Sequence, residues 1–460
     1  MYSGDETRTS SDAHRSASRR FPRRVLFVLL LVGLIARIIA TTHEGWEKPP
    51  EYRSDAAEYD SYAWNLAQGH GYIGISPDVY NPDGSYLVHP SAYRIPGISL
   101  YWAALYKIFG HKYSAVRISE CLMDTLTILL IFTIARKCFS NTVAILAAAI
   151  YAVWPPALQY VCQLRCETQY TFLLFVFILL CLIFAERKTW SWSIAAGLVL
   201  GLALLTRGNG IMMVALVFPW SVWQFRKNPR VMVRGIAIAL VALATLVPWT
   251  IRNYRLFHAY IPFESGGGDV LLGVYNNAVA SDPNLYGSWT DPTALPEYTK
   301  LLTQPNDELV RDRIQKQLAI QWIRNHPDKW WYLQETRFRR GWTPFLQPWA
   351  PLLRRLEILA VWGTVVLLLA IGFFPTAIHF LRTGSPAWII HLGILHYEIT
   401  VQVFYGASRL RYPVEGLCII LASATAVWIG KGIGKRMGHN STSNSQSRTG
   451  RIQTASISAV

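Results

Sequence analysis

The sequence predicts an all-α polytopic membrane protein, and three observations support this fold class. Of its 460 residues, 52% are hydrophobic and only 16% are charged, whereas soluble domains carry about 25% charged residues. The chain contains 18 Trp, 23 Tyr and 19 Phe, and aromatic residues collect at the two interfaces of a bilayer. It also contains repeated apolar runs close to the ~20 residues that a membrane-spanning helix needs. This composition excludes a disordered chain, a disulfide scaffold and an ordinary cytosolic enzyme.

Ten apolar runs are predicted to be transmembrane helices. They cover residues 25–41, 114–135, 142–158, 168–185, 190–206, 210–223, 233–251, 356–374, 386–405 and 414–429. A further run, residues 95–110, is only 16 residues long and contains one Trp and two Tyr. These features are typical of a helix that lies along the membrane interface. We therefore expect this interfacial helix not to cross the bilayer.

The positive charge is concentrated at the two ends and in short loops. The formal net charge is +16, and six arginines fall within residues 1–24. Both basic ends adjoin apolar runs, so they are interpreted as cytoplasmic flanks under the positive-inside rule and not as arms that bind nucleic acid. Ten spans place both termini and the short basic loops on the cytoplasmic side. Counting residues 95–110 as an eleventh span would reverse every later loop.

Two long segments are predicted to lie outside the membrane. The first, residues 42–94, has a net charge of −5, and the second contains an amphipathic helical stretch, residues 307–340, that breaks near Pro327. The predicted parts are a basic cytoplasmic tail (1–24), a transmembrane core (25–251) with the first outside loop (42–94) and the interfacial helix (95–110), a periplasmic segment (252–355), C-terminal transmembrane helices (356–430) and a disordered cytoplasmic tail (431–460).

The first outside loop contains a short predicted helix, residues 54–67, that ends before Gly69. Asp55 and Glu58 are three residues apart and therefore share one face of this helix. Helix caps are common, so the D-x-x-E pattern by itself favours a capping box with Asp55 as the N-cap. The alternative is a general base at the outer membrane surface, with a pKa raised by partial burial.

Arginines occur at the outer ends of several predicted spans, namely Arg94, Arg207, Arg252, Arg409 and Arg411. Each one alone fits a side chain that snorkels to the interface. Together they would surround an external cavity with guanidinium groups, which suit a phosphate. Glu167 begins the fourth span, where a helix N-terminus favours an acid. His396 and Glu398 lie inside the ninth span, and the sequence assigns them no role.

The sequence gives no clear metal or nucleotide site. It has no C-x-x-C or His-rich spacing, and its six cysteines lie in or beside apolar runs, where buried small hydrophobic side chains are the simpler interpretation. Residues 69–74 match G-x-G-x-x-G, but they follow a predicted helix and not a strand. They are therefore interpreted as a turn-rich loop.

Several segments resemble one family. DAAEYDSYAWNLAQGHGY, followed by AYRIPGISLYWAALYKIFG, resembles the start of the bacterial relatives of dolichyl-phosphate-mannose protein mannosyltransferases, which include the lipid A aminoarabinose transferase-like group. These proteins belong to the GT-C superfamily of membrane glycosyltransferases. GLALLTRGNG, PWTIRNYRLFHAYIPFESGGG, NHPDKWW and SRLRYPVEGLCIILA follow in the order that the family shows. The resemblance covers nearly the whole chain, from the first span to about Ile429.

The resemblance implies an inverting glycosyltransferase that moves a sugar from a polyprenyl-phosphate donor to an acceptor hydroxyl on a lipid, glycan or protein at the outer face of the cell (inner) membrane. It implies a catalytic aspartate that matches Asp55. Many members have Glu at the next position, where this chain has Ala56, so Glu58 or Asp60 would supply a second carboxylate. The family's RPPGYP is RIPGIS here, which keeps Arg94. Relatives differ in metal dependence, so no cofactor is assigned and a divalent metal is left open.

Two other functions fit parts of the sequence. A transporter or flippase for a lipid-linked sugar would also be polytopic, but the long outside segments and the lack of an internal repeat count against it. A lipid-linked oligosaccharide ligase is closer in chemistry, and the sequence does not separate it from a glycosyltransferase.

Overall fold

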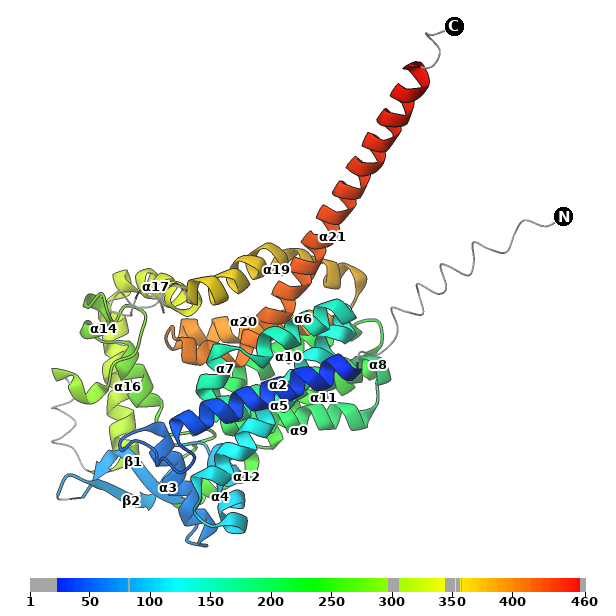
Figure 1. Cartoon of the computed structure of the whole chain (residues 1–460). Helices are drawn as coiled ribbons and strands as arrows, with labels where there is room; N and C mark the ends of the chain where they lie inside the picture. Colours follow the sequence, from blue (N-terminus) through cyan, green and yellow to red (C-terminus); the bar gives the residue numbers. More distant parts are fainter. Residues whose placement is uncertain are drawn as a thin grey trace.

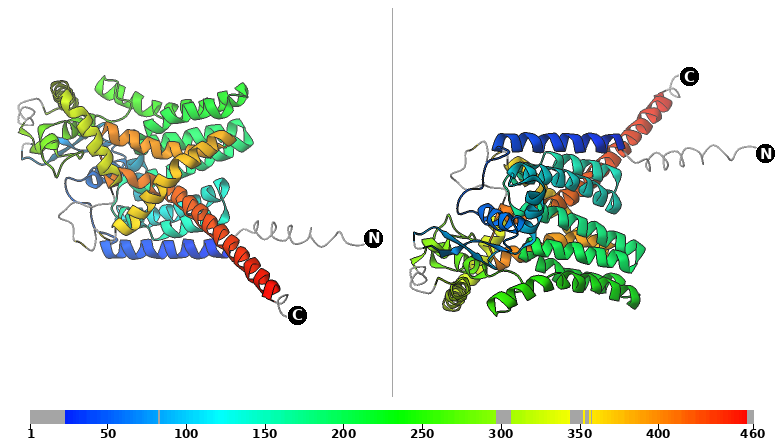
Figure 2. Two further views of the ribbon diagram at one scale, coloured as in Figure 1. Left: turned by 90° about the horizontal axis from the view of Figure 1, so that it is seen from above. Right: turned by 90° about the horizontal axis from the view of Figure 1, so that it is seen from below.

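The computed structural model describes residues 23–81, 83–296, 306–343, 352, 356 and 358–455. Long helices run side by side and form the body of the molecule, while a strand pair and shorter helices gather at one end (Figure 1). The views from above and below show the same division (Figure 2). The basic tail expected at residues 1–24 lies almost wholly outside the described residues.

The body consists of α-helices whose bounds follow the predicted apolar runs. They are α2 (Arg23–Glu44), α5 (Tyr113–Cys138), α6 (Asn141–Ala152), α7 (Pro155–Tyr160), α8 (Cys166–Arg187), α9 (Trp190–Thr206), α10 (Ile211–Phe225), α11 (Pro229–Ala244), α12 (Val247–Phe257), α19 (Thr364–Thr383), α20 (Ile389–Val403) and α21 (Ser408–Ala455). Short turns accompany them: η1 (Gly208–Gly210), the π-helical η5 (Leu359–Gly363) and η6 (Pro386–Trp388). The backbone of α21 is helical through residues 438–455, for which the sequence predicts disorder.

Six helical stretches among the described residues are long and apolar enough to cross a membrane. They are Arg23–Glu44, Tyr113–Cys138, Cys166–Arg187, Pro229–Phe257, Leu359–Thr383 and Ser408–Ile433. Asn141–Ala152 and Trp190–Thr206 are apolar but shorter. The multi-pass membrane fold is therefore confirmed, while the count of ten spans stays a prediction.

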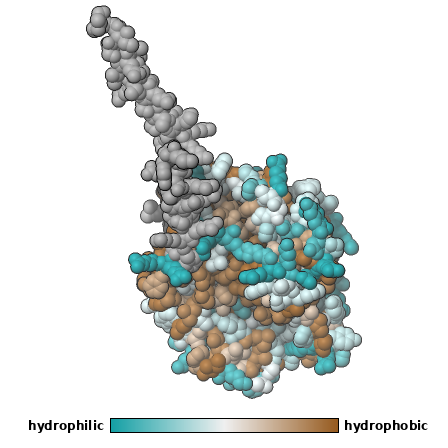
Figure 3. Space-filling model, turned by 90° about the vertical axis from the view of Figure 1, so that its right-hand side faces the viewer, coloured by the Kyte–Doolittle hydropathy of each residue, from teal (hydrophilic) through white to brown (hydrophobic). Residues whose placement is uncertain are grey.

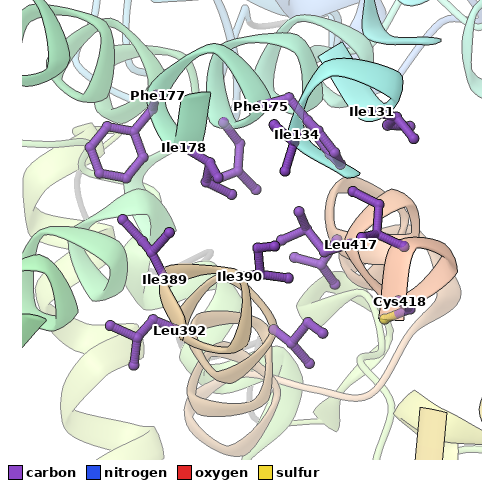
Figure 4. Close-up of a cluster of buried hydrophobic side chains, with 14 of the residues drawn as sticks. Ile131, Ile134, Phe175, Phe177, Ile178, Ile389, Ile390, Leu392, Leu417 and Cys418 are labelled. Atoms are coloured by element: carbon purple, nitrogen blue, oxygen red, sulfur yellow. The ribbon is translucent and has the colours of Figure 1, made fainter. Parts of the chain in front are cut away.

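Close helix contacts in the body depend on small residues. A Cβ atom added to Gly197 on α9 would lie 2.7 Å from Val241 Cβ on α11, and one added to Gly372 on α19 would lie 1.8 Å from Thr425 Oγ1 on α21. Glycine lets such helices approach where lipid gives no hydrophobic driving force. Large side chains fill the space between α5, α8, α20 and α21 (Figure 4), including Phe175, Ile390 and Leu417.

A buried ion pair joins four helices inside the body. Arg37 Nε on α2 lies 2.7 Å from Asp124 Oδ2 on α5, and both side chains are fully buried. Asp124 Oδ1 also accepts hydrogen bonds from the hydroxyls of Tyr151 at 2.8 Å and Tyr412 at 3.1 Å. Charged groups are rare inside a membrane unless they are paired. This cluster, which the sequence interpretation missed, therefore fixes α2, α5, α6 and α21 against one another.

The first outside loop forms a helix and a β-hairpin. Helix α3 (Asp55–Ala67) ends before Gly69 as predicted. Strands β1 (Ile73–Tyr80) and β2 (Tyr86–Pro90) then pair antiparallel, with Ile73 opposite Pro90. The sequence interpretation expected only helices and a turn-rich loop here. It missed the hairpin because β1 contains a proline, which weakens the strand signal.

Helix α4 (Gly97–Phe109) corresponds to the expected interfacial helix. It has 13 residues, which is about 20 Å at ~1.5 Å per residue and shorter than a bilayer core. Trp102 on α4 contacts Tyr59 on α3 edge to face, with ring centroids 6.1 Å apart. At its start α4 touches the end of α9: a Cβ atom added to Gly97 would lie 2.4 Å from the carbonyl oxygen of Leu205.

The second outside segment is mostly helical among its described residues. It contains α13 (Gly267–Val274), α14 (Asn277–Ser281), η2 (Pro292–Ala294), α16 (Glu308–Asn325), η4 (Pro327–Lys329) and α17 (Trp330–Trp342). The break at Pro327 is where the sequence places it. Glu308 on α16 ties the two outside segments together, because its carboxylate accepts hydrogen bonds from Ser91 Oγ at 2.6 Å and from the Ala92 amide at 3.0 Å.

Basic side chains gather at the end of the body away from the outside segments. Figure 3 views this end, where hydrophilic side chains form a band beside hydrophobic surface. The exposed basic residues at the helix ends here are Arg136, Lys137, Arg187, Lys188, Arg226, Lys227 and Arg230. This distribution supports the proposed cytoplasmic placement of this end.

The first prediction tests this placement. Ser85 lies after the β1–β2 turn, and Thr189 lies in the exposed loop between α8 and α9. In intact cells, an impermeant thiol reagent should label Ser85→Cys and not Thr189→Cys, while both should react after permeabilisation. The protein without an added cysteine is the negative control and should not be labelled, because its described cysteines are buried or half-buried. Equal labelling of the two positions in intact cells would contradict the topology.

The second prediction concerns the Arg37–Asp124 pair. Asp124→Leu leaves a buried guanidinium group without its anion, which typically costs about 3–5 kcal/mol of stability. Arg37→Met combined with Asp124→Leu removes both charges and should melt closer to the unchanged protein. Thermal unfolding in detergent, followed by size-exclusion chromatography, measures both effects. Arg382→Met removes an exposed arginine at the end of α19 and serves as the control. A single variant as stable as the double variant would refute the pairing argument.

Candidate active site

A cavity of about 670 Å³ opens between the outside segments and the adjacent ends of the body helices. Its charged lining residues are Arg53, Asp55, Glu58, Arg94, Arg207, Glu264, Asp269, Asp291 and Arg409. Tyr59, Tyr93, Asn209, Trp289 and Tyr405 also line it. Three of the five arginines singled out in the sequence and two of its carboxylates thus meet in one space.

Helix α3 places Asp55 at the cavity without using it as a cap. The N-cap is Ser54, whose hydroxyl accepts a hydrogen bond from the Ala57 amide at 3.3 Å. Asp55 is therefore the first helical residue, and the capping interpretation of its side chain is wrong. Its Oδ1 lies 2.6 Å from Arg94 Nη2, and its Oδ2 lies 2.5 Å from Arg409 Nη2. Each carboxylate oxygen thus has its own arginine.

Glu58 lies one turn further along α3 and faces the same side, as its spacing predicts. Its carboxylate forms an ion pair with Arg94 Nε. The Arg94 guanidinium group also lies over the rings of Tyr59 and Tyr93, at 5.5 Å and 5.0 Å from their centroids. Two carboxylates and two aromatic rings therefore hold this arginine in one orientation.

Glu167 and Arg207 continue the ion-pair chain from the body. Glu167 lies in the first turn of α8, is fully buried and pairs with Arg409 Nε. Arg207 follows the last residue of α9, and its Nη1 lies 3.6 Å from Glu167 Oε1. Among the described residues this Nη1 has no hydrogen-bond partner, and Asn209 Oδ1 also has none. The cavity therefore contains a buried donor and a buried acceptor that a ligand could satisfy.

The arginines control the charge of Asp55. Burial alone would raise the pKa of its carboxyl group, but the guanidinium groups of Arg94 and Arg409 outweigh burial and hold this pKa well below its usual range. Asp55 is therefore ionised at neutral pH.

The structure places three other candidates away from the cavity. Asp60 accepts a hydrogen bond from Tyr106 at 2.7 Å and lies 2.8 Å from His111 Nε2. Arg252 donates to the carbonyl oxygens of Tyr72 and Ser91, both at 2.7 Å.

Arg411 is buried. It donates to Glu415 at 2.8 Å and to the Gly341 carbonyl at 2.6 Å, and it lies over the Trp362 ring. Arg252 and Arg411 thus connect segments of the chain and do not line the cavity, so three of the five arginines expected there meet in it and two do not.

The two ionisable residues without a predicted role lie on α20. His396 Nε2 is 3.0 Å from the Tyr170 hydroxyl, and Glu398 accepts a hydrogen bond from Trp342 Nε1 at 2.6 Å. Neither side chain lines the cavity.

Glu264 is one of the charged cavity residues that sequence reasoning missed, together with Arg53, Asp269 and Asp291. It lies in the loop between α12 and α13, within the segment PFESGGG, where no spacing or periodicity marks it. Only its presence in a segment shared with the family could have drawn attention to it.

The described residues contain no group of three or more His, Cys, Asp or Glu side chains placed to hold a metal ion. Asp55 and Glu58 instead have arginine partners. A divalent metal therefore finds no ready set of ligands in this part of the chain.

Comparisons with known proteins agree with this architecture. Residues 88–250 match the model of the dolichyl-phosphate-mannose-protein mannosyltransferase family. A search of curated protein sequences finds no match. The oligosaccharyltransferase AglB from Archaeoglobus fulgidus, solved with an inhibitory peptide and a dolichol-phosphate, aligns with 90% of this chain and 52% of its own at 13% identity and a TM-score of 0.54.

The apo form of the Archaeoglobus fulgidus oligosaccharyltransferase aligns with 91% of this chain and 52% of its own at 15% identity and a TM-score of 0.54. This chain thus spans about half the length of the archaeal enzyme. ArnT from Cupriavidus metallidurans, bound to undecaprenyl phosphate, aligns with 88% of this chain and 78% of its own at 12% identity and a TM-score of 0.39. The resemblance seen in the sequence is confirmed: the chain has the GT-C fold, and its residues 88–250 match the dolichyl-phosphate-mannose-protein mannosyltransferase family.

Proposed function

We propose that this protein is an inverting glycosyltransferase that transfers a hexose or pentose from a polyprenyl-phosphate donor to an acceptor hydroxyl at the outer face of the inner membrane. The acceptor is a lipid, glycan or protein. The observation that carries the proposal is the meeting of Arg94, Arg207 and Arg409 in one cavity at the ends of the body helices. No soluble nucleotide sugar is needed, because the donor arrives through the membrane itself.

The arginines have donor groups left for a phosphate. Arg94 and Arg409 each use Nε and Nη2 to bind carboxylates in the described part of the chain, so Nη1 of each stays available to a ligand. Arg207 Nη1 is buried and has no hydrogen-bond partner among the described residues. Guanidinium groups suit phosphate oxygens, and here they would stabilise the negative charge that grows on the phosphate as it leaves the sugar.

The lipid part of the donor fits the position of the cavity. Arg207 and Arg409 lie at the ends of α9 and α21, beside the apolar body. A polyprenyl chain in the bilayer would thus bring its phosphate to the depth of these side chains, and holding both reactants there would supply much of the rate enhancement. The dolichol-phosphate in the archaeal neighbour and the family match support a polyprenyl-phosphate ligand.

Asp55 is best assigned to the arginines themselves. The family resemblance makes it the general base, yet both its oxygens are paired and its pKa is held low. An effective base has a pKa near the working pH and an oxygen free for the proton. We therefore propose that Asp55, with Glu58 and Glu167, keeps Arg94 and Arg409 aligned for the leaving phosphate.

The third prediction tests the phosphate site by binding. Arg207→Ala and Arg409→Ala should each weaken the binding of a short-chain polyprenyl phosphate by about 10- to 100-fold, since a hydrogen bond to a charged group contributes ~1.5–3 kcal/mol. Isothermal titration in detergent measures the affinity. Arg339→Ala is the control, because this arginine is exposed on α17 and pairs with Glu335. Unchanged affinity in both cavity variants would remove the phosphate site.

The fourth prediction tests transfer. Purified protein is incubated with membrane extract and a panel of radiolabelled polyprenyl-phosphate hexoses and pentoses, and sugar transfer is followed. Asp55→Asn should still form α3, because Ser54 caps this helix, and size-exclusion chromatography checks that the variant is folded. It should transfer about 10²–10³ times more slowly, because neutral Asn no longer balances two guanidinium groups that stabilise the leaving phosphate.

Glu335→Gln changes an exposed carboxylate on α17 and should transfer at the unchanged rate. Full activity of Asp55→Asn would show that Asp55 does not support the reaction. No sugar release by the unchanged protein from any donor would overturn the proposed function.

A further inference from the structure

Glu264 lines the cavity near Arg94 and Arg207 but forms no ion pair with an arginine among the described residues. Ion pairs among the described residues at this site involve Asp55, Glu58 and Glu167, and Glu264 takes part in none of them. Its carboxylate accepts a hydrogen bond from the backbone amide of Ile95, the residue that follows Arg94. On another side, a Cβ atom added to Gly208 would lie 3.8 Å from its Oε1. Glu264 thus sits between the residues that follow Arg94 and Arg207.

The loop that carries Glu264 is firmly attached. The Ser265 amide donates to the Ala92 carbonyl at 2.9 Å, and the Ser265 hydroxyl bonds to the Glu308 carboxylate. On the other side, Trp249 Nε1 donates to the Phe263 carbonyl at 2.5 Å. These contacts surround Glu264 in sequence, so the backbone fixes its position beside the proposed phosphate site.

The surroundings of Glu264 differ from those of Asp55. The charged and titratable groups that face it are Arg94, Asp55, Arg207 and Tyr72. Burial raises the pKa of the Glu264 carboxyl group. Arg94, the Ile95 amide and Arg207 oppose this effect, Asp55 adds to it, and the net result is a raised pKa. Neighbouring carboxyls whose pKa values are pushed in opposite directions are a common sign of divided roles at an active site.

We propose that Glu264 is the catalytic base of the transfer reaction and takes the proton from the acceptor hydroxyl, an inference that rests on the proposed function. As the acceptor oxygen forms its bond to the anomeric carbon, its proton passes to a Glu264 carboxylate oxygen. The bond from the anomeric carbon to the phosphate oxygen breaks, and its electron pair stays on the phosphate. Arg94, Arg207 and Arg409 receive the phosphate charge, while Asp55 remains ionised between its two arginines.

The fifth prediction compares the two carboxylates in the transfer assay across pH. For the unchanged protein, kcat/KM should fall as the pH is lowered, because the base becomes protonated. We call this fall the acid limb of the pH profile. Glu264→Gln keeps the shape and the hydrogen bond from Ile95 but cannot take a proton, so transfer should fall about 10²–10⁴-fold. Its residual activity should lack the acid limb. Asp55→Asn should be slower as well but should keep the acid limb, and Glu335→Gln should match the unchanged protein.

A second measurement separates catalysis from folding. Because the raised pKa means that the folded protein disfavours ionised Glu264, this group lowers stability above its folded pKa and has no such effect below the unfolded value. Glu264→Gln should therefore raise the melting temperature at pH 8, with a smaller gain at pH 5. A stabilised but inactive variant supports the proposal, because it excludes misfolding as the cause of the lost activity.

Other outcomes would overturn it. A folded Glu264→Gln variant that transfers sugar at the unchanged rate, or that keeps the acid limb, would show that another group is the base. Loss of the acid limb in Asp55→Asn would move the role to Asp55. If the unchanged protein transfers sugar from no donor, the proposed function itself fails, and that result is distinct from the failure of a single variant.

Discussion

The candidate site depends on a chain of opposite charges that runs from the first outside loop into the body. Arg94, Asp55, Arg409 and Glu167 alternate in sign and come from four separate segments. Without the carboxylates, the ends of these segments would bring positive groups together in a partly dry space, where repulsion is strong. The carboxylates thus neutralise the arginines and allow them to lie close together while no anion is bound. A phosphate would meet a site whose positive charge is already assembled, so little reorganisation is needed when it arrives.

A carboxylate also neutralises an arginine inside the body of the molecule. The Arg37–Asp124 pair and its two tyrosine hydroxyls satisfy a charge where lipid surrounds the helices. This cluster holds helices that carry no cavity residue against α21, which carries Arg409. The stability of the body and the geometry of the cavity are therefore coupled through α21. A substitution that weakens the contact between α2 and α5 would therefore shift α21 and alter the cavity, although no residue of the site is changed.

The sequence predicted the features that follow from local patterns. Apolar runs marked the spans, and the three-residue spacing placed Asp55 and Glu58 on one face of α3. The positions of Arg207 and Arg409 at helix ends marked them as candidates, but Arg411 has a similar position. Whether such an arginine lines a cavity or binds a backbone carbonyl depends on tertiary contacts, which the sequence does not show. Capping was assigned one residue too late, since Ser54 and Asp55 are both good caps. Glu264 had no local signal at all: its position in the cavity depends on tertiary contacts of its loop, such as those of Ser265 with Ala92 and of Phe263 with Trp249, which local patterns do not reveal.

The lack of a side chain at Gly97 helps to set the dimensions of the site. This glycine rests on the carbonyl oxygen of Leu205, where an added Cβ atom would lie only 2.4 Å away. Backbone cannot move aside as a side chain does, so any larger residue would push the start of α4 off the end of α9. Arg94 lies three residues before this contact, and Arg207 lies two residues after it. The spacing between Arg94, which precedes α4, and Arg207, which follows α9, therefore depends on the absence of a side chain at Gly97.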